Sequence, residues 1–293
     1  MCYQITKSPN YHSCLRGFTL IELSIVLVII GLISGAVLAG RDLIRAAELR
    51  SIVTEYENYQ SAFRIFQDKY SALPGDMSDA TAFWGTATNC PGDDTTPSND
   101  EKTCNGNGNG IIEYHYSAAV PSTELHRAWQ HLSNAKLISG HYTGVQATSA
   151  NIRTFSYENS PSSKFKNSIW TCVSYGHRPS TDLYWWEGNY NNQLGFRGTT
   201  ASGFDSVKLS PADARNIDIK LDDGKPQYGK VRTMRKNLHP SCTTTNVEAT
   251  TDYDLTSNVT DACQLLFLPF QYGVSIKDSQ FCYPCEVSEI FIN

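Results

Sequence analysis

The sequence predicts an α+β fold in which a long N-terminal spine helix packs on an antiparallel β-sheet. An apolar run of 23 residues, 18–40, continues directly into a pattern with helical periodicity. After Asp76 the pattern changes to short aromatic and β-branched runs between clusters of Gly, Asn, Ser and Pro, which is typical of strands. With 293 residues and 40% hydrophobic content, the chain is large enough to bury a core.

The composition excludes several classes of protein. Charged residues make up 18% of the chain and aromatic residues 11%, which argues against intrinsic disorder. The net charge of −5 provides no basic field for nucleic acid, so no nucleic-acid partner is expected. The mean hydropathy of −0.35 excludes a membrane protein with many spans, but not one with a single span.

The first element is the apolar run at 18–40, which predicts a transmembrane helix. At about 1.5 Å per residue it covers the roughly 30 Å hydrocarbon core of a bilayer. A secretory signal peptide has a shorter apolar region of about 7–15 residues. The preceding segment, 1–17, carries Lys7 and Arg16, so the positive-inside rule predicts a cytoplasmic leader and export of everything after Arg41.

The junction between leader and apolar run carries a specific motif. Residues 16–23 read RGFTLIEL. This stretch resembles the class III signal of type IV pilins and of the pseudopilins of type II secretion. The resemblance implies that prepilin peptidase cuts between Gly17 and Phe18, that Phe18 is then N-methylated, and that Glu22 becomes the fifth residue of the mature chain. It also implies a bacterial inner-membrane protein with its head in the periplasm, assembled with other pilin or pseudopilin subunits into a filament.

Glu22 is the one charge in the apolar run. A carboxylate inside a membrane helix costs about 2.5–3.5 kcal/mol on insertion scales, so it usually marks a function or a partner. The amine of a processed Phe18 in a neighbouring chain would neutralise it and set the register of an assembly. The alternative is a tolerated charge near the interface.

Gly31 and Gly35 add a small-xxx-small pattern that permits close helix approach, or are incidental glycines. Ala39 stands where many pilins carry a proline, so no kink is expected there.

Residues 41–73 predict the amphipathic second half of the spine. Leu73-Pro74-Gly75-Asp76 ends it, and 74–293 forms the head. The expected buried stripe consists of Leu49, Ile52, Val53, Tyr56, Phe63, Phe66 and Tyr70. The opposite face carries Arg45, Glu48, Arg50, Glu55, Glu57, Arg64 and Asp68.

The head is expected to contain one further helix and several strands. The helix is predicted from Thr123 to Ile138, with Ser122 as N-cap, Gly140 as stop, and a buried side of Trp129, Leu132, Leu137 and Ile138. Strands are predicted at Ser168–Tyr175, Thr181–Trp186, Ile217–Lys220, Gly229–Arg235, Cys263–Pro269 and Gly273–Ile276.

Seven cysteines follow the leader, in a part of the chain that export would place in an oxidising compartment. Cys90 and Cys104 flank a polar loop and most simply close it, and disulfides are the preferred interpretation throughout. Zinc bound by Cys242, Cys263, Cys282 and Cys285 is an alternative. Redox chemistry at Cys282 and Cys285 is another, although no thioredoxin-like context surrounds them. The disulfide candidates are Cys90, Cys104, Cys172, Cys242, Cys263, Cys282 and Cys285. Because seven is odd, at least one of these thiols is free or pairs with another chain.

A glycine-rich stretch suggests a structural calcium site. Asn105, Asn107 and Asn109 have the one-three-five spacing of a calcium loop, with Gly110 at position six. Charge could come from acidic residues nearby, which are Asp93, Asp94, Asp100, Glu101, Glu113 and Glu124. Position one lacks Asp and position twelve is Tyr116, which excludes an intact EF-hand. The alternative is a turn with asparagines in left-handed conformations. No cofactor is otherwise required.

The chain contains no P-loop, HExxH or GxSxG motif, and its seven histidines are scattered, so no enzyme is predicted. The leading hypothesis is a structural subunit of a type IV pilus or type II secretion filament. The alternative is a minor pilin whose head acts as an adhesin or substrate-binding module at a filament tip, in keeping with a large head. A membrane-anchored periplasmic enzyme would leave the motif around Gly17 unexplained.

Overall fold

The computed structural model describes residues 18–88, 90, 101–113, 124–145, 159–198 and 209–268. The chain divides into two compact units, residues 1–48 and 49–293, and the division falls inside the first helix. Each unit is described by itself.

Helix α1 runs from Leu20 to Tyr70 without interruption and includes Ala39. In the first unit its apolar side chains are exposed, from Leu20 at 88% to Leu38 at 63%. An 18-residue window of this helix has a mean hydropathy of 2.6 and none of it is buried. The helix is therefore long and apolar enough to cross a membrane, as predicted.

In the second unit, the remainder of α1 buries one stripe of side chains. Most of the predicted stripe is confirmed, with Ala62 in addition and Val53 and Tyr70 half-buried. The buried members are Leu49, Ile52, Tyr56, Ala62, Phe63 and Phe66. Glu55 is a correction to the polar face: its carboxylate accepts hydrogen bonds from the indole N–H of Trp170 and the backbone N–H of Lys164, both at 2.8 Å.

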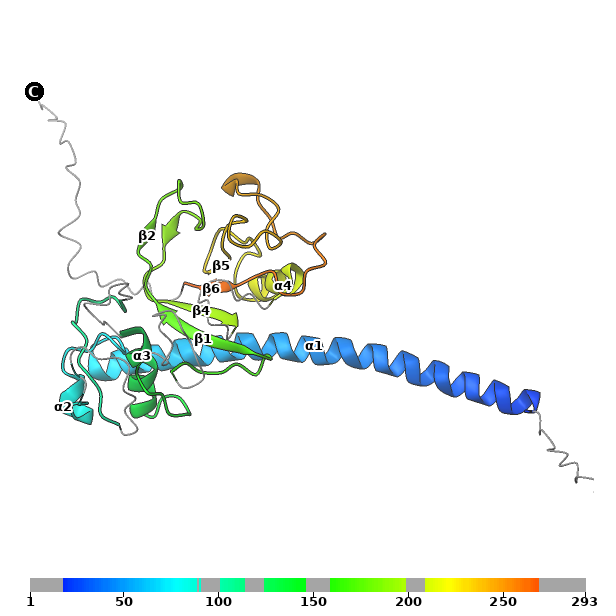
Figure 1. The fold of residues 1–293 in the computed structure, drawn as a ribbon, viewed down its shortest axis with the longest axis horizontal. Coiled ribbons are helices and arrows are strands. Elements are labelled where there is room, and N and C mark those ends of the chain that lie inside the picture. The colour runs from blue at the N-terminus through cyan, green and yellow to red at the C-terminus, as the bar shows by residue number, and fades with distance from the viewer. Residues whose placement is uncertain are drawn as a thin grey trace, which may run out of the picture. The chain divides into compact units, whose positions relative to one another are not determined.

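Within the described residues, the larger sheet has four antiparallel strands in the order β1-β4-β6-β5. The strands are β1 (Ser168–Val173), β4 (Gln193–Gly198), β6 (Leu265–Phe267) and β5 (Val231–Arg232). In the second unit, β1 and β4 lie along α1 (Figure 1). The expected α+β fold, a long helix with an antiparallel sheet in a pilin-like arrangement, is confirmed.

Aromatic rings join α1 to one face of this sheet. Tyr56 stacks on Phe267 with ring centroids 4.6 Å apart, and Tyr59 meets Trp170 edge-on at 5.6 Å. Successive side chains of a strand point to opposite faces of the sheet, so Leu266 lies on the other face from its neighbours in β6. It packs in a second, smaller cluster with Trp185, Tyr190 and Met234.

The other elements in the described part of the head are short. They are α2 (Ala80–Trp84), α3 (Glu124–Asn134), the two-stranded ribbon of β2 (His177–Arg178) and β3 (Gly188–Asn189), α4 (Pro211–Leu221), and the 3-10 turn η1 (Glu248–Thr250). Helix α3 is shorter than predicted because Lys136 adopts a positive φ of 62°, which ends the helical path. Leu137 and Ile138 therefore lie beyond the helix and are half-buried, whereas Trp129 and Leu132 are fully buried within it.

The strand predicted at Ile217–Lys220 is wrong, because these residues lie in α4. Ser210 caps this helix by accepting the backbone N–H of Asp213 at 3.2 Å, and Pro211 occupies the first helical position. Both are strong helix-start signals, and they outweigh the β-branched pattern of a short run.

The strand predicted at Thr181–Trp186 is also wrong. The carboxylate of Asp182 accepts the backbone N–H groups of Tyr184 and Trp185, at 2.8 and 3.0 Å, which bends the chain into a turn. The strand β4 was not predicted. The predictions at 168–175, 229–235 and 263–269 are confirmed in shortened form, and Gly273–Ile276 lies outside the described residues.

Candidate functional site

The start of α1 is organised by a reciprocal pair of hydrogen bonds between Thr19 and Glu22. The Glu22 carboxylate accepts the backbone N–H and the hydroxyl of Thr19, both at 2.8 Å. In return the hydroxyl of Thr19 accepts the backbone N–H of Glu22 at 3.3 Å. This arrangement is a capping box, with the N-cap threonine three residues before a glutamate. The spacing of Thr19 and Glu22 is visible in the sequence, but Glu22 was interpreted only as a charge for assembly, and its role as a cap was missed.

Of the two residues that flank the predicted cleavage site, the structure describes only Phe18. Phe18 lies just before α1 and is 85% exposed. Gly17, and with it the proposed scissile bond, lies outside the described residues. Gly31 and Gly35 lie in α1, and a methyl group added at either position would meet no atom within 4 Å apart from those of the adjoining helix backbone, so both leave an open helix surface.

In the head, the turn after α1 is enclosed by a buried acidic pair, Asp76 and Glu124. Asp76 is 3% exposed and accepts the backbone N–H groups of Asn109 and Gly110 at 3.0 and 2.8 Å. Glu124 is 5% exposed and accepts those of Asn107 and Glu113 at 3.0 and 2.9 Å. Each carboxylate therefore satisfies backbone donors of the asparagine-rich loop.

Burial of these two carboxylates changes their acidity. Desolvation raises the pKa of Glu124 to about 7, against the lowering effect of its two backbone donors. Desolvation likewise raises the pKa of Asp76. The charges of Asp76 and Glu113 contribute to the raised pKa of Glu124, so acidic groups act on one another across this loop.

The four predicted calcium ligands fall into two groups. The side-chain amides of Asn107 and Asn109 both donate to the Glu113 carboxylate, at 2.7 and 3.0 Å, so these three side chains converge. Asn105 is engaged elsewhere: its side-chain oxygen accepts the backbone N–H of Thr81 at 2.8 Å. Glu124 was among the acidic residues expected to supply charge to this loop, and it does lie beside it. The participation of Asp76 was not predicted, because Asp76 lies before the loop at a large distance in sequence.

The asparagine-rich loop needs a glycine at position 106, where its backbone passes close to the turn after α1. A side chain at Gly106 would overlap the backbone of Asp76, which explains why this position has none. Nearby, His131 is fully buried and accepts the backbone N–H of Gly75 at Nδ1, 2.9 Å away. Its Nε2 lies 2.9 Å from the hydroxyl of Thr103. Both ring nitrogens are thus used in a neutral ring, and desolvation lowers the pKa of His131 to about 3.

Disulfides join two pairs of the described cysteines. Cys90 is bonded to Cys104, which closes the polar loop, and Cys242 is bonded to Cys263. The second bond uses two of the four thiols considered for zinc, so that zinc site is wrong. Cys172, which was also a disulfide candidate, is free and buried instead. Cys282 and Cys285 lie outside the described residues.

A second acidic cluster, which was not predicted, lies at the end of α4. The carboxylates of Asp218, Asp222 and Asp223 offer oxygens within 4.8 Å of one another. Asp218 accepts the hydroxyl of Tyr253 at 2.8 Å, and desolvation raises the pKa of Asp218 to about 7. Asp222 accepts the backbone N–H of Lys230. These contacts fix the loop after α4 to the rest of the head. In the sequence, the run Asp222-Asp223-Gly224 is the feature that could have indicated this acidic cluster.

Comparison with known proteins addresses the N-terminal segment. A family model of the prokaryotic N-terminal methylation motif matches residues 14–38. Comparisons with curated proteins and with solved structures find no match. The chain therefore carries a prepilin-type signal of the kind found on type IV pilin and pseudopilin precursors. The apolar part of α1 fits membrane anchoring by the same segment.

Proposed function

We propose that this chain is the precursor of a structural subunit of a type IV pilus or a type II secretion filament. The observation that carries the proposal is the methylation motif at residues 14–38, which coincides with the start of an exposed apolar helix. Prepilin peptidase removes residues 1–17 at the cytoplasmic face of the inner membrane and Phe18 is methylated. The subunit then leaves the membrane and packs through α1 against other pilin or pseudopilin subunits.

Glu22 has two compatible tasks in this proposal. One carboxylate oxygen, Oε2, receives both donors of Thr19. The other oxygen remains available to the amine of Phe18 on a neighbouring subunit, which relieves the cost of a charge in apolar surroundings. The proposal assigns no catalytic role to the chain.

The experiment is N-terminal peptide mass analysis of the full chain coexpressed with a prepilin peptidase. Wild type should begin at Phe18 with one added methyl group. Gly17→Glu should remain uncut, because the resemblance makes this glycine the residue before the scissile bond. Gly35→Ala, which changes a glycine of α1 outside that bond, should be processed like wild type. A mature chain that retains Arg16 would overturn the proposal.

A minor subunit at a filament tip, acting as an adhesin or substrate-binding module, is the second candidate. Its support is a head that contains a polar pocket beside α1. Immunogold labelling of the head distinguishes the two: a structural subunit decorates the filament along its length, and a tip subunit only its end.

We also propose that the loop around Asn107, Asn109 and Glu113 holds a structural calcium ion. The amide groups of Asn107 and Asn109 meet the Glu113 carboxylate through their N–H groups, and their oxygens accept backbone N–H groups. Calcium binding therefore requires both amides to turn their oxygens toward the ion, beside the negative charge that Asp76 and Glu124 add. Carboxylate and amide oxygens are the ligands that calcium prefers, and its flexible geometry suits an irregular loop. Bound there, calcium would offset the mutual repulsion of the acidic groups.

A further inference from the structure

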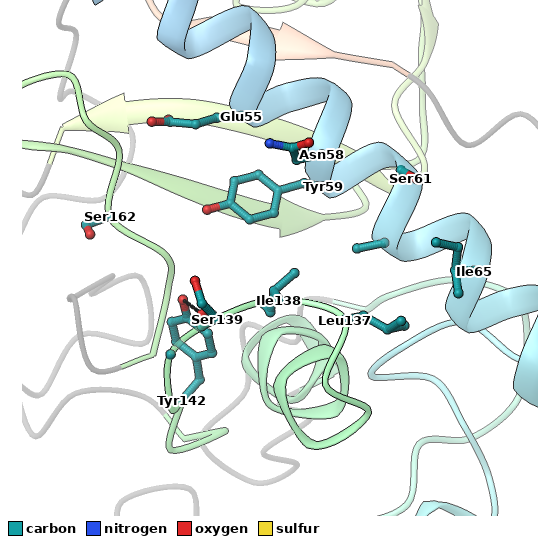
Figure 2. Close-up of a pocket in the computed structure, with 12 residues that line it drawn as sticks. Glu55, Asn58, Tyr59, Ser61, Ile65, Leu137, Ile138, Ser139, Tyr142 and Ser162 are labelled. Atoms are coloured by element: carbon teal, nitrogen blue, oxygen red, sulfur yellow. Dashed lines mark hydrogen bonds between the residues drawn. The ribbon is translucent and has the colours of Figure 1, made fainter.

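The head contains a pocket of about 590 Å³ between α1 and the segment that follows α3. Its wall on α1 runs from Glu55 to Ile65, and the opposite wall from Leu137 to Tyr142, with Ser162 at the side (Figure 2). All of these residues belong to the second unit. A volume of this size lies in the range of small-molecule sites.

Most of the side chains that line this pocket can form hydrogen bonds without carrying a charge. The hydroxyl, amide and carboxylate groups come from Glu55, Asn58, Tyr59, Ser61, Ser139, Tyr142 and Ser162. Together they offer both donors and acceptors, as a ligand with many hydroxyl groups requires. Of the described residues in the lining, Glu55 alone carries a charge, which disfavours anionic ligands.

The carboxylate of Glu55 is held in a fixed position. Oε1 accepts the backbone N–H of Lys164 and Oε2 the indole N–H of Trp170, each at 2.8 Å. Each carboxylate oxygen has a second lone pair, so Glu55 can still accept hydroxyl donors. Because two hydrogen bonds already stabilise its charge, the carboxylate does not need a cationic ligand.

The two tyrosines are also fixed by their neighbours. The ring of Tyr59 meets Trp129 and Trp170 edge-on, at centroid distances of 5.3 and 5.6 Å. The hydroxyl of Tyr142 donates to the carbonyl of Ser139 at 3.1 Å. Burial raises the pKa of Tyr59, and the nearby Tyr142 and Glu55 raise it further, so its hydroxyl remains a donor. In Figure 2 this hydroxyl points toward the space bounded by Ser162 and Tyr142.

Apolar side chains complete the wall beside these polar groups. Ile65 is 48% exposed, and Leu137 and Ile138 are half-buried. A sugar ring presents hydroxyl groups at its rim and C–H groups on its faces, so it needs this combination of polar and apolar contacts. Aromatic rings contribute to the apolar contacts, since their electron-rich faces attract C–H groups.

We propose that this pocket binds a neutral saccharide. Glu55 and Asn58 contact the sugar hydroxyls, Tyr59 donates a further hydrogen bond, and Ile65, Leu137 and Ile138 cover an apolar edge. The proposal concerns the head alone and does not rest on the role of the chain in a filament.

The test is a binding titration on the full chain, purified in a detergent without a sugar headgroup. The probes are galactose, glucose, N-acetylglucosamine and lactose, with glucuronic acid as the anionic probe and spermidine as the cationic one. At least one neutral sugar should bind with a dissociation constant in the millimolar range or below, and glucuronic acid should not bind.

Two variants place the binding in the pocket. Asn58→Ala removes an exposed side chain, and Tyr59→Phe removes one hydroxyl while keeping the ring. Each should weaken binding about three- to tenfold, the effect of one hydrogen bond. Asn258→Ala, an exposed asparagine outside the lining, should bind like wild type. Binding of spermidine alone, no binding of any neutral sugar, or unchanged binding in both pocket variants would each overturn the proposal.

Discussion

The carboxylate of Glu55 in α1 accepts a 2.8 Å hydrogen bond from the indole N–H of Trp170 in β1. Trp170 is fully buried, so this bond satisfies a polar atom inside the core that joins helix and sheet. An acidic residue of the supposed solvent face of the helix thus contributes to the packing of the head.

Changing Glu55 to Leu should lower the free energy of unfolding by about 1–3 kcal/mol, because the indole N–H of Trp170 would be left unsatisfied. Glu55→Gln should cost less, since its carbonyl oxygen still accepts one bond. Urea denaturation of the full chain in detergent, followed by tryptophan fluorescence, measures both. Glu57→Gln, in an exposed position of the same helix, should stay within about 0.5 kcal/mol of wild type. Equal stability of Glu55→Leu and wild type would show that the bond contributes nothing.

The buried His131 should make the head less stable in acid. Its pKa is about 3 when folded and 6.5 when unfolded, so its contribution is complete above pH 6.5 and is lost as pH falls toward 3. Glu124 and Asp218, whose folded pKa values are about 7, act in the opposite direction. The net slope of the wild type therefore does not isolate the histidine.

A His131→Gln variant removes this titration alone and retains a donor and an acceptor. The stability difference between wild type and this variant should shrink by about 1.4 kcal/mol for each pH unit below 6.5. Urea denaturation at pH 7.5, 6 and 5 provides the measurement. A difference that stays constant across these values would mean that the folded state does not exclude the proton.

The Cys90–Cys104 bond should stabilise the head by closing a loop with a sequence separation of 14 residues. The chain-entropy relation gives about 3 kcal/mol for such a loop, so the double change Cys90→Ser and Cys104→Ser should lose about that amount. Peptide mapping under non-reducing conditions should recover the two cysteines in one linked peptide. Quantitative alkylation of both thiols in the native protein would contradict the bond.

Millimolar calcium should raise the melting temperature of the full chain relative to chelator. Binding to the folded state alone contributes about 2.7 kcal/mol at a hundredfold excess over the dissociation constant. The double variant Asn107→Ala and Asn109→Ala should lose the effect, and Asn258→Ala should keep it. Identical melting temperatures with calcium and chelator in wild type would leave the loop as a glycine-rich turn.

At Glu22, the two tasks can be separated by variants. Glu22→Gln preserves the capping box, because glutamine also accepts at this position, but removes the charge. It should insert into the membrane as well as wild type and enter filaments less. Thr19→Val removes the hydroxyl and keeps the charge, so it should assemble better than Glu22→Gln. Membrane fractionation and immunoblotting of sheared filaments measure both steps. Equal incorporation of Glu22→Gln and wild type would remove the charge from the assembly mechanism.

Several features of the head depended on contacts between distant parts of the chain. Asp76 and Glu124 lie 48 positions apart, and neither local spacing nor composition indicates that both accept backbone donors of one loop. The strand β4 was missed because its sequence, QLGFRG, contains two glycines and a charge. Its extended form is stabilised by pairing with β1 on one side and β6 on the other.

The features that the sequence by itself determined are those with local causes. Apolar periodicity defines α1, the length and apolarity of 18–40 define a span, and the motif around Phe18 is read from adjacent residues. The helix cap at Ser210 also has a local cause and could have been predicted from the sequence. Tertiary structure alone decided the strand order, the hydrogen bonds of Glu55, the burial of His131 and the pocket beside α1. The reason is that hydrogen bonding and desolvation there depend on residues brought together only by folding.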